Sequence, residues 1–275
     1  MNNLNIVTFN CNGALKNKDY QQTLISFFQL NRINIALLQE THIDNLSWKK
    51  EIDNIFNCNS LWSFGSNSSR GVAILLFKNF YFNVNKFVKD MDGRIISANI
   101  TSDFGETKLM SIYCPNEPPD RKRFLKTLDF YVSGPDPILM GGDWNCVENT
   151  VLDKEGGNPN KGTEGAEIIK EMKNTYEVMD PFREIHPKLK IFTWVNETTG
   201  VKTRIDRFYI NKFMKTNIVK VNKVTSIVSD HAGFMISLQG NLARQFSVGK
   251  GIWKLNTEIL KNENFVLEIE DIWHE

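Results

Sequence analysis

The sequence predicts an α/β sandwich, in which two facing mixed β-sheets are flanked by helices in an α/β/β/α arrangement. Short apolar segments rich in β-forming residues alternate along the chain with segments of helical periodicity. No internal repeat or low-complexity tract interrupts this alternation. The chain has 275 residues, 41% of them hydrophobic, which is enough to bury a sizeable core without disulfide bonds.

Strands are expected where β-branched and aromatic residues form short runs bounded by polar or turn-forming residues. These runs cover residues 5–10, 33–39, 71–78, 95–101, 108–113, 137–141 and 233–238. Two further runs, 192–196 and 204–210, are expected to pair with each other around a polar tip at 197–203. Apolar residues at helical spacing predict helices at 21–31, 120–132 and 166–176, the last after a Gly- and Asn-rich loop at 155–165.

The C-terminal part of the chain differs from the rest, because the globular pattern ends near Leu238. We place a domain boundary at residue 240 and interpret residues 241–275 as a linker followed by an amphipathic segment. In that segment Phe265, Ile269, Ile272 and Trp273 recur at helical spacing. Since the sequence ends without a helix stop signal, we expect it to be part of a longer chain.

Charge and cysteine content restrict the function only loosely. The net charge of +1 gives no indication of nucleic-acid binding, which often relies on a basic excess. The four cysteines lack metal-binding spacing, so reduced thiols in a cytosolic or nuclear protein are expected. The longest apolar runs, such as 35–38 and 72–77, are too short for a membrane span, and no signal-peptide pattern opens the chain. We therefore expect no membrane partner.

Polar residues of the kinds found in metal and phosphate sites follow several predicted strands. If those strand ends converge, their carboxylates raise one another's pKa values, a penalty that a hard divalent cation removes. Magnesium, which keeps several waters and takes one or two carboxylates plus substrate phosphate, fits such a group. The residues are Asn10, Asn12, Glu40, Tyr113, Asn116, Asp143, Asn145, Asp206, Asp230 and His231.

Phosphodiester hydrolysis is the reaction that requires such a site. A carboxylate orients and deprotonates water, a cation neutralises the phosphate, and a further group stabilises the departing oxyanion. His231 beside an acidic partner is suited to contacting a phosphate oxygen. Taken singly, such residues are more often turn formers, caps or core residues. The other histidines, His42, His186 and His274, are interpreted as structural.

The order of these residues resembles the motif set of the endonuclease/exonuclease/phosphatase superfamily, which includes deoxyribonuclease I. The motifs follow the family order across residues 1–240, and the resemblance implies a DNase I-like catalytic domain there. The motifs are N-x-N-G from Asn10, Q-E-T-H from Gln39, Y-x-P-N from Tyr113, G-D-W-N from Gly142, T-W from Thr193, R-I-D-R from Arg204 and S-D-H from Ser229.

Within the superfamily, the chain resembles the endonuclease domains of LINE-type (non-LTR) retrotransposons. The similar segments are 146–157 (CVENTVLDKEGG), His186-Pro187 followed by 192–194, and 249–256 (GKGIWKLN). The last resembles the segment that joins endonuclease to reverse transcriptase. The resemblance implies a double-stranded DNA target, nicked to leave a 3′-hydroxyl that primes reverse transcription. It also implies a downstream reverse transcriptase domain as partner and a nuclear site of action after synthesis in the cytoplasm.

The resemblance assigns metal binding to Glu40, with help from Asn12 or Asp230. Magnesium is the expected ion, with manganese as a substitute. Apurinic endonucleases that resemble this chain carry Asp where Asn12 stands. That difference weakens both a second metal site and an abasic-site activity.

The resemblance also assigns the chemistry. Asp143 is expected to orient and activate the attacking water, and His231, with Asp206 as its acidic partner, to contact the phosphate. Support of the reacting phosphate is implied for Asn10, Tyr113 and Asn145, and substrate contact or its positioning for Asn116, Thr193, Lys202 and Ser229.

Several alternatives stay open at this point. One is an apurinic/apyrimidinic-type repair endonuclease, and another is a phosphatase of the same superfamily, whose inositol-phosphatase motif the R-I-D-R-F segment from Arg204 does not match. A third, an inactive binding module, has no support because no expected acidic or histidine position is replaced. The tip at 197–203 occupies the place of a hairpin that approaches the minor groove in relatives. Only Lys202 in it is basic, so recognition of DNA shape is expected, with a merely flexible hairpin as the alternative.

Overall fold

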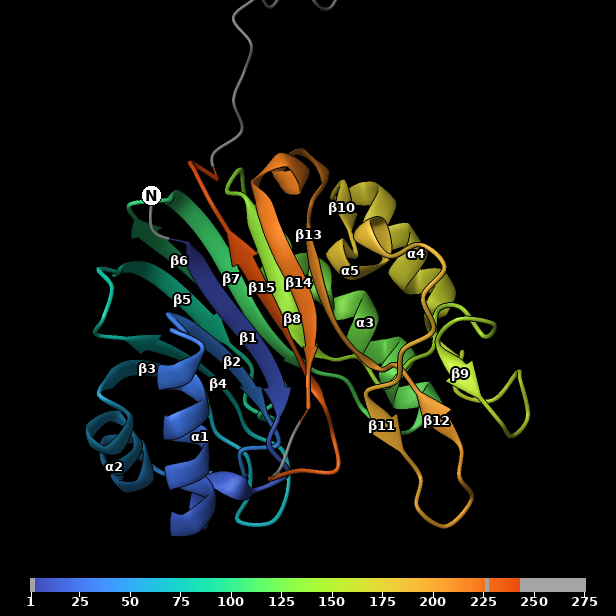
Figure 1. The fold of residues 1–275 in the computed structure, drawn as a ribbon, viewed down its shortest axis with the longest axis horizontal. Helices are drawn as coiled ribbons and strands as arrows, with labels where there is room; N and C mark the ends of the chain where they lie inside the picture. The colour runs from blue at the N-terminus through green and yellow to red at the C-terminus, as the bar shows by residue number, and fades with distance from the viewer. Residues whose placement is uncertain (1–2, 226–227, 243–275) are drawn as a thin grey trace, which may run out of the picture. The chain divides into compact units, whose positions relative to one another are not determined.

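Two six-stranded mixed β-sheets face each other in residues 3–225 and 228–242, the part of the chain that the computed structural model describes (Figure 1). The first sheet has the order β14 (Ile218–Val224), β15 (Gly233–Leu238), β1 (Leu4–Asn10), β2 (Ile35–Gln39), β4 (Val72–Phe77) and β3 (Cys58–Ser63). The second has the order β10 (Val178–Met179), β13 (Asp206–Asn211), β8 (Ile138–Asp143), β7 (Gly105–Tyr113), β6 (Ile95–Ser102) and β5 (Asn83–Lys89).

Helices cover the outer faces of the two sheets (Figure 1). The first sheet packs against α1 (Lys18–Leu30) and α2 (Leu46–Phe56), the second against α3 (Pro118–Val132) and α4 (Ala166–Thr175). A separate apolar core, which includes Leu37 and Phe208, fills the space between the sheets. The predicted α/β/β/α sandwich is therefore confirmed. The short helices are η1 (Ala14–Lys16), α5 (Pro181–Ile185) and η2 (Lys212–Asn217).

The predicted pairing of 192–196 with 204–210 is wrong. In the structure β11 (Trp194–Val195) pairs with β12 (Lys202–Thr203), which continues to β9 (Lys154–Glu155) in a small third sheet. Residues from Asp206 onward form β13, which is buried along its whole length and pairs with β8. Burial explains the difference. A strand that is buried at every position belongs in a large sheet covered on both faces, and only the more polar segment before it forms the hairpin.

Among the elements that were not predicted from the sequence are α2, β3, β5 and β14. The three strands lie at sheet edges, and β5 and β14 together contain a single buried residue, so their apolar pattern is weak. Helix α2 begins after Asn45, whose side chain accepts hydrogen bonds from the N–H groups of Ser47 and Trp48. That N-cap residue was the available sequence signal.

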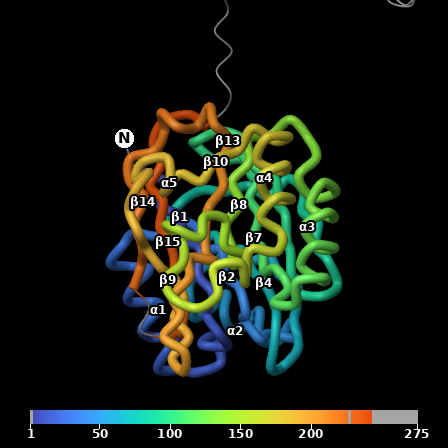
Figure 2. The backbone as a smooth tube through the Cα atoms, turned by 90° about the vertical axis from the view of Figure 1, so that its right-hand side faces the viewer, coloured from blue at the N-terminus to red at the C-terminus, as the bar shows by residue number. Residues whose placement is uncertain are grey.

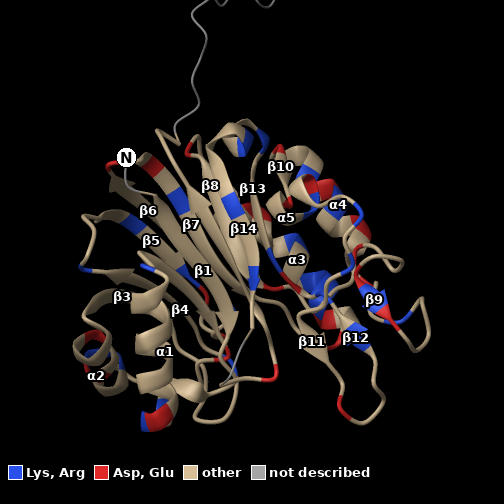
Figure 3. Cartoon of the chain, in the orientation of Figure 1, with Lys and Arg blue, Asp and Glu red and all other residues tan. Residues whose placement is uncertain are grey.

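The last 33 positions cannot be compared with the prediction, because residues 243–275, which hold most of the predicted linker and amphipathic segment, lie outside the described residues. Within the described ranges, no helix is both long and apolar enough to cross a membrane. Positions of Lys and Arg and of Asp and Glu are spread over strands, helices and loops (Figure 3). This distribution agrees with the near-zero net charge.

Candidate active site at the strand ends

The ends of five strands bring the predicted polar residues to one edge of the sandwich. In the first sheet, parallel pairing sets Asn10 of β1 beside Gln39 of β2, so Glu40 follows at the same edge. In the second sheet, Asp143 of β8 lies beside both Tyr113 of β7 and Asp206 of β13. A pocket of about 340 Å³ opens there, lined by Asn10, Asn12, Glu40, Tyr113, Asn116, Asp143, Asn145, Trp194, Ile205, Asp230 and His231.

A close approach of the two sheets places Asp143 against Asn10. A Cβ atom at Gly141 would lie 2.8 Å from both Leu37 Cδ1 and Phe208 Cε1. A side chain there would force the sheets apart, so glycine permits the contact. Two residues later the Asn10 amide donates a hydrogen bond to Asp143 Oδ2 at 3.0 Å, across 133 positions of sequence.

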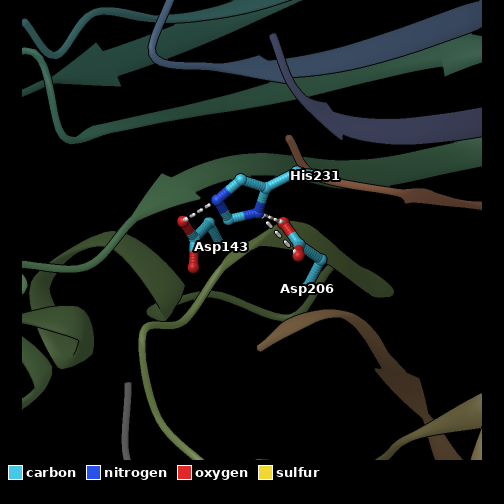
Figure 4. A group of neighbouring side chains, drawn as sticks. All are labelled: Asp143, Asp206 and His231. Atoms are coloured by element: carbon cyan, nitrogen blue, oxygen red, sulfur yellow. Dashed lines mark hydrogen bonds and ion pairs between the residues drawn. The ribbon is translucent and has the colours of Figure 1, made fainter. Parts of the chain in front are cut away.

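His231 lies between two buried carboxylates (Figure 4). Its Nδ1 is 3.0 Å from Asp206 Oδ2, and its Nε2 is 4.0 Å from Asp143 Oδ2. The first distance is a hydrogen bond, which fixes the ring so that Nε2 points toward the pocket. The second is too long for one and leaves a gap for a water or a phosphate oxygen. The predicted contact between Asp206 and His231 is therefore present in the structure as a hydrogen bond.

Burial and charge shift the pKa values of this group. Burial, with the negative charge of Asp206, raises the pKa of Asp143 to about 7, against the opposing effect of His231. Burial alone would lower the pKa of His231, but the charge and hydrogen bond of Asp206 raise it to about 10. At neutral pH His231 is therefore a cation. The pKa of Asp143 lies close to neutral pH, so its carboxylate can accept a proton there.

Amide groups orient the Asp143 carboxylate and the loop beside it. The backbone N–H of Asn145 donates to Asp143 Oδ1 at 2.9 Å. The side-chain amide of Asn145 donates to the Cys114 carbonyl and to Asn116 Oδ1, both at 2.8 Å. The Tyr113 hydroxyl also donates to Asn116 Oδ1, at 3.3 Å. Burial raises the pKa of Tyr113, and the nearby Glu40 carboxylate raises it further, so the hydroxyl keeps its proton.

Glu40 is held from outside the pocket. Its Oε2 lies 2.8 Å from His42 Nε2 and accepts a hydrogen bond from the backbone N–H of Arg70, also at 2.8 Å. Glu40, His42 and Arg70 all have left-handed φ values, of 50°, 54° and 61°. Such values are uncommon outside glycine, and they concentrate where surrounding structure enforces them. The structural interpretation of His42 is thus incomplete, because the side chain contacts a residue of the pocket.

Asp230 is the third carboxylate that lines the pocket. Its Oδ1 accepts a hydrogen bond from the Asn12 side chain at 3.1 Å, and its Oδ2 accepts one from Trp194 Nε1 at 3.0 Å. Trp194 also forms a β-bridge with His231. Trp194 was not among the predicted site residues. Its only sequence signal was its place in the T-W motif at the start of the hairpin.

The pocket fits a hard divalent cation. Among the described residues that line it, three are carboxylates and none is Lys or Arg. Ligand atoms of Asp143, Asp206 and His231 lie within 4.8 Å of one another and form one candidate group. However, His231 already uses Nδ1 for Asp206 and keeps a proton on Nε2, so its ring has no free lone pair. Oxygen donors from Glu40, Asn12 and Asp230 are therefore the better match to such an ion.

Four predicted residues lie beside the pocket or outside it rather than in its lining, and one of them is Asp206, which is buried behind His231. The hydroxyl of Thr193 accepts hydrogen bonds from the N–H groups of Ile205 and Asp206, at 3.0 and 3.1 Å. The hydroxyl of Ser229 accepts one from the N–H of His231 at 3.1 Å. Both therefore position the Asp206–His231 pair. Lys202 lies in the hairpin, where it forms an ion pair with Glu155 at 2.6 Å.

Comparison with known proteins identifies relatives in sequence. The model of a family described as the endonuclease/exonuclease/phosphatase family matches residues 7–231. A Xenopus laevis protein described as the transposon TX1 uncharacterized 149 kDa protein is 27% identical over 283 aligned positions. That alignment covers 98% of this chain and 20% of the transposon protein, so the chain spans about a fifth of that relative's length.

Solved structures share the fold at low sequence identity. An AP endonuclease from Archaeoglobus fulgidus has a TM-score of 0.67 at 19% identity, covering 86% of this chain and 99% of that one. AP endonuclease LMAP from Leishmania major has a TM-score of 0.67 at 15% identity, covering 86% and 88%. The 3′ phosphatase NExo from Neisseria, bound to a product DNA hairpin, has a TM-score of 0.69 at 17% identity, covering 86% and 99%. These likenesses establish the DNase I-like sandwich.

Proposed function

The chain belongs to the endonuclease/exonuclease/phosphatase family, and from that premise we propose that it is a magnesium-dependent endonuclease that nicks double-stranded DNA. The observation that carries the proposal is the pocket itself. It combines a protonated histidine with three carboxylates, one of which, Asp143, is poised to accept a proton. No Lys or Arg lines it among the described residues. Each requirement of phosphodiester hydrolysis then has a side chain to meet it.

Asp143 activates the nucleophile in this proposal. Its two oxygens are held by the Asn10 amide and the Asn145 backbone N–H, so its orientation is fixed before substrate binds. A pKa of about 7 keeps it ionised at mildly alkaline pH, yet basic enough to take a proton from water. The water would lie in the pocket next to Oδ2, on the side that faces His231.

His231 and Tyr113 stabilise the phosphate. The His231 Nε2–H faces the pocket because Nδ1 is bound to Asp206, and the raised pKa keeps the ring charged. Tyr113 retains its hydroxyl proton, and it would donate that proton to a non-bridging oxygen by exchanging its 3.3 Å hydrogen bond to Asn116 Oδ1. Asn145 already donates both amide hydrogens within the protein, so its contact with substrate stays a prediction that requires one of these bonds to exchange.

A divalent cation would be held by Glu40 with Asn12 or Asp230. When bound, it supplies charge neutralisation of the phosphate and of the departing 3′ oxygen. Magnesium is the proposed ion because the donors are all oxygen, and manganese should replace it.

The biological role that we propose is target-site nicking for a LINE-type retrotransposon. The support is the transposon relative, which aligns with 98% of this chain. The nick would leave a 5′-phosphate and a 3′-hydroxyl, and the hydroxyl would prime reverse transcription by a downstream domain of the same polyprotein. The protein would be made in the cytoplasm and act in the nucleus.

Abasic-site repair is the second candidate, and the AP endonuclease structures with the same fold favour it. The Asn12 position, where abasic-site enzymes resembling this chain carry Asp, argues against it. Competition separates the two candidates. A repair enzyme would be strongly inhibited on plasmid by a small excess of abasic duplex, whereas the proposed endonuclease would be inhibited no more than by intact duplex.

The decisive experiment measures nicking of supercoiled plasmid by the full chain. We expect nicking with magnesium or manganese, loss of nicking on adding a chelator, and recovery when the ion is restored in excess. The nicks should be resealed by DNA ligase and extended by a DNA polymerase without prior phosphatase treatment, since both require a 3′-hydroxyl. Products that need phosphatase before extension, or cleavage that persists in chelator, would refute the proposal.

A further inference from the structure

The Glu40 carboxylate is oriented by two donors on one of its oxygens. Oε2 accepts hydrogen bonds from the His42 ring and from the backbone N–H of Arg70, each at 2.8 Å. An ionised carboxylate only accepts hydrogen bonds, so the His42 nitrogen that faces it, Nε2, is the donor. Both side chains are mostly buried, with 17% of His42 and 16% of Glu40 exposed. The other carboxylate oxygen of Glu40, Oε1, takes part in neither of these two hydrogen bonds.

We propose that His42 is a positioning residue for the metal ion of the proposed function, on which this inference rests. The imidazole fixes Glu40 in the conformation that presents Oε1 to the cation. A carboxylate that is already oriented loses less side-chain entropy when the ion binds, and partners that hold ligands in this way affect metal affinity by about 10–100-fold.

The backbone around His42 supports a positioning role, because it fixes the segment independently of the imidazole. The N–H of Gly13 donates to the Glu40 carbonyl at 2.7 Å. On the other side, the N–H groups of Thr41 and His42 donate to the carbonyls of Gly71 and Arg70, at 3.0 and 2.9 Å. Removing the imidazole therefore leaves residues 40–42 held by three backbone hydrogen bonds.

The packing around the ring also fits this role. Gly13 has a left-handed φ of 74°, and a Cβ atom there would lie only 2.6 Å from His42 Nδ1. The loop after β1 thus approaches the ring closely on its Nδ1 side, while Nε2 is directed to Glu40. With both sides of the ring used within the protein and its exposure low, His42 has little surface to offer to DNA.

The test compares His42→Ala with His42→Gln, whose amide can still donate a hydrogen bond, and with His186→Ala as a matched control. His186 lies at the end of α5, where its ring packs on Phe182 at 5.0 Å between centroids, and it does not line the pocket. Binding of manganese to the full chain without DNA is measured by electron paramagnetic resonance of the free ion. The magnesium concentration for half-maximal nicking, the KM for DNA and the thermal midpoint are measured in parallel.

We expect His42→Ala to raise both the manganese Kd and the half-maximal magnesium concentration by about 10–100-fold. At saturating magnesium its nicking rate should return to near that of the wild type, with an unchanged KM for DNA. His42→Gln should recover most of the lost affinity, and His186→Ala should match the wild type throughout.

Three results would overturn the inference, and they differ from failure of the proposed function. A raised KM for DNA with unchanged metal affinity would make His42 a DNA contact. A rate loss at every magnesium concentration, together with a lower thermal midpoint, would make it structural. A manganese Kd in His42→Ala equal to that of the wild type would show that the His42 imidazole has no role in binding the ion. If the wild type itself neither binds manganese nor nicks plasmid, the proposed function fails, and this inference fails with it.

Discussion

Two buried charge clusters near the start of β13 are built in opposite ways. The first, which we propose to be catalytic and call the catalytic cluster, comprises Asp143, Asp206 and His231. The ion-pair cluster comprises Asp153, Asp180, Arg183 and Arg204, which line a separate cavity of about 420 Å³ near α5. Asp206 and Arg204 are two positions apart, yet Asp206 pairs with His231 in one cluster and Arg204 pairs with two aspartates in the other.

The clusters differ in how charges are matched. In the ion-pair cluster, Arg204 contacts Asp153 at 2.8 Å and Asp180 at 2.6 Å, and Arg183 contacts Asp153 at 2.6 Å. Burial would raise the pKa of Asp153, but the hydrogen bond and charge of Arg204 lower it overall. In the catalytic cluster two carboxylates share one imidazole, and the pKa of Asp143 is raised to about 7. Full pairing therefore stabilises a buried carboxylate, and incomplete pairing leaves one reactive.

The largest expected effect is on catalysis. Replacing Asp143 or His231 with Ala should lower the nicking rate by about 10²–10⁴-fold each, since each replacement removes a proton-transfer or electrostatic contribution. Initial rates on supercoiled plasmid at saturating magnesium measure the loss, with circular dichroism to verify folding. Nicking at the wild-type rate in both variants would remove the catalytic cluster from the mechanism.

The next effect is on stability. Arg204→Ala should lower the free energy of unfolding by about 3–5 kcal/mol, because it leaves Asp153 and Asp180 buried without their shared partner. Lys215→Ala is the control, since it breaks an exposed ion pair with Glu184 and should cost less than about 1 kcal/mol. Urea denaturation monitored by tryptophan fluorescence gives both values. Equal losses in the two variants would contradict the distinction between buried and exposed pairs.

A pH dependence of opposite sign should distinguish the two clusters. The folded pKa of Asp143, about 7, exceeds its ordinary value of 3.8, so ionising it costs stability, and the cost grows as pH rises from about 4 through 7. Asp143→Asn should therefore be more stable than the wild type by roughly 1–3 kcal/mol at pH 8, and should lose that advantage toward pH 4. These values are for protein without metal.

Asp153→Asn provides the opposite case. The pKa of Asp153 is lowered in the folded protein, so its stabilising contribution is present above its ordinary pKa and disappears as pH falls. This variant should be less stable than the wild type at pH 8, and the difference should shrink in acid. Denaturation curves for both variants at pH 4.5 and pH 8 test the pair. Differences of the same sign would mean that charge matching does not separate the clusters.

The smallest effect on rate is expected at the hairpin tip, residues 197–200, whose side chains are exposed. Exchanging these residues for an unrelated turn of equal length should change nicking by no more than about threefold, since it leaves β11 and the contacts of Trp194 with His231 and Asp230 in place. The positions of nicks on long natural DNA should shift if the tip reads DNA shape. The tip belongs to the orange hairpin at the lower edge of the tube in Figure 2. An unchanged cleavage map would assign it no part in recognition.

Local pattern was enough to predict much of the fold. The strand at 233–238 has the predicted bounds, and the runs that end before Glu40, Asn116 and Asn145 form β2, β7 and β8. A strand that is buried in the core consists of a short apolar run. The polar residue that follows the run marks where the chain leaves the core. The sequence therefore determined the fold class and most of the residues that line the pocket.

Partners distant in sequence were decided only by the tertiary structure. Nothing in the local pattern of 204–210 distinguishes a hairpin with 192–196 from a place beside β8, and the structure shows the latter. The same holds for Trp194 on Asp230 and for Arg204 between two aspartates. Periodicity records whether a side chain is buried, but which groups meet, and hence which pKa values move, depends on how the two sheets are packed together.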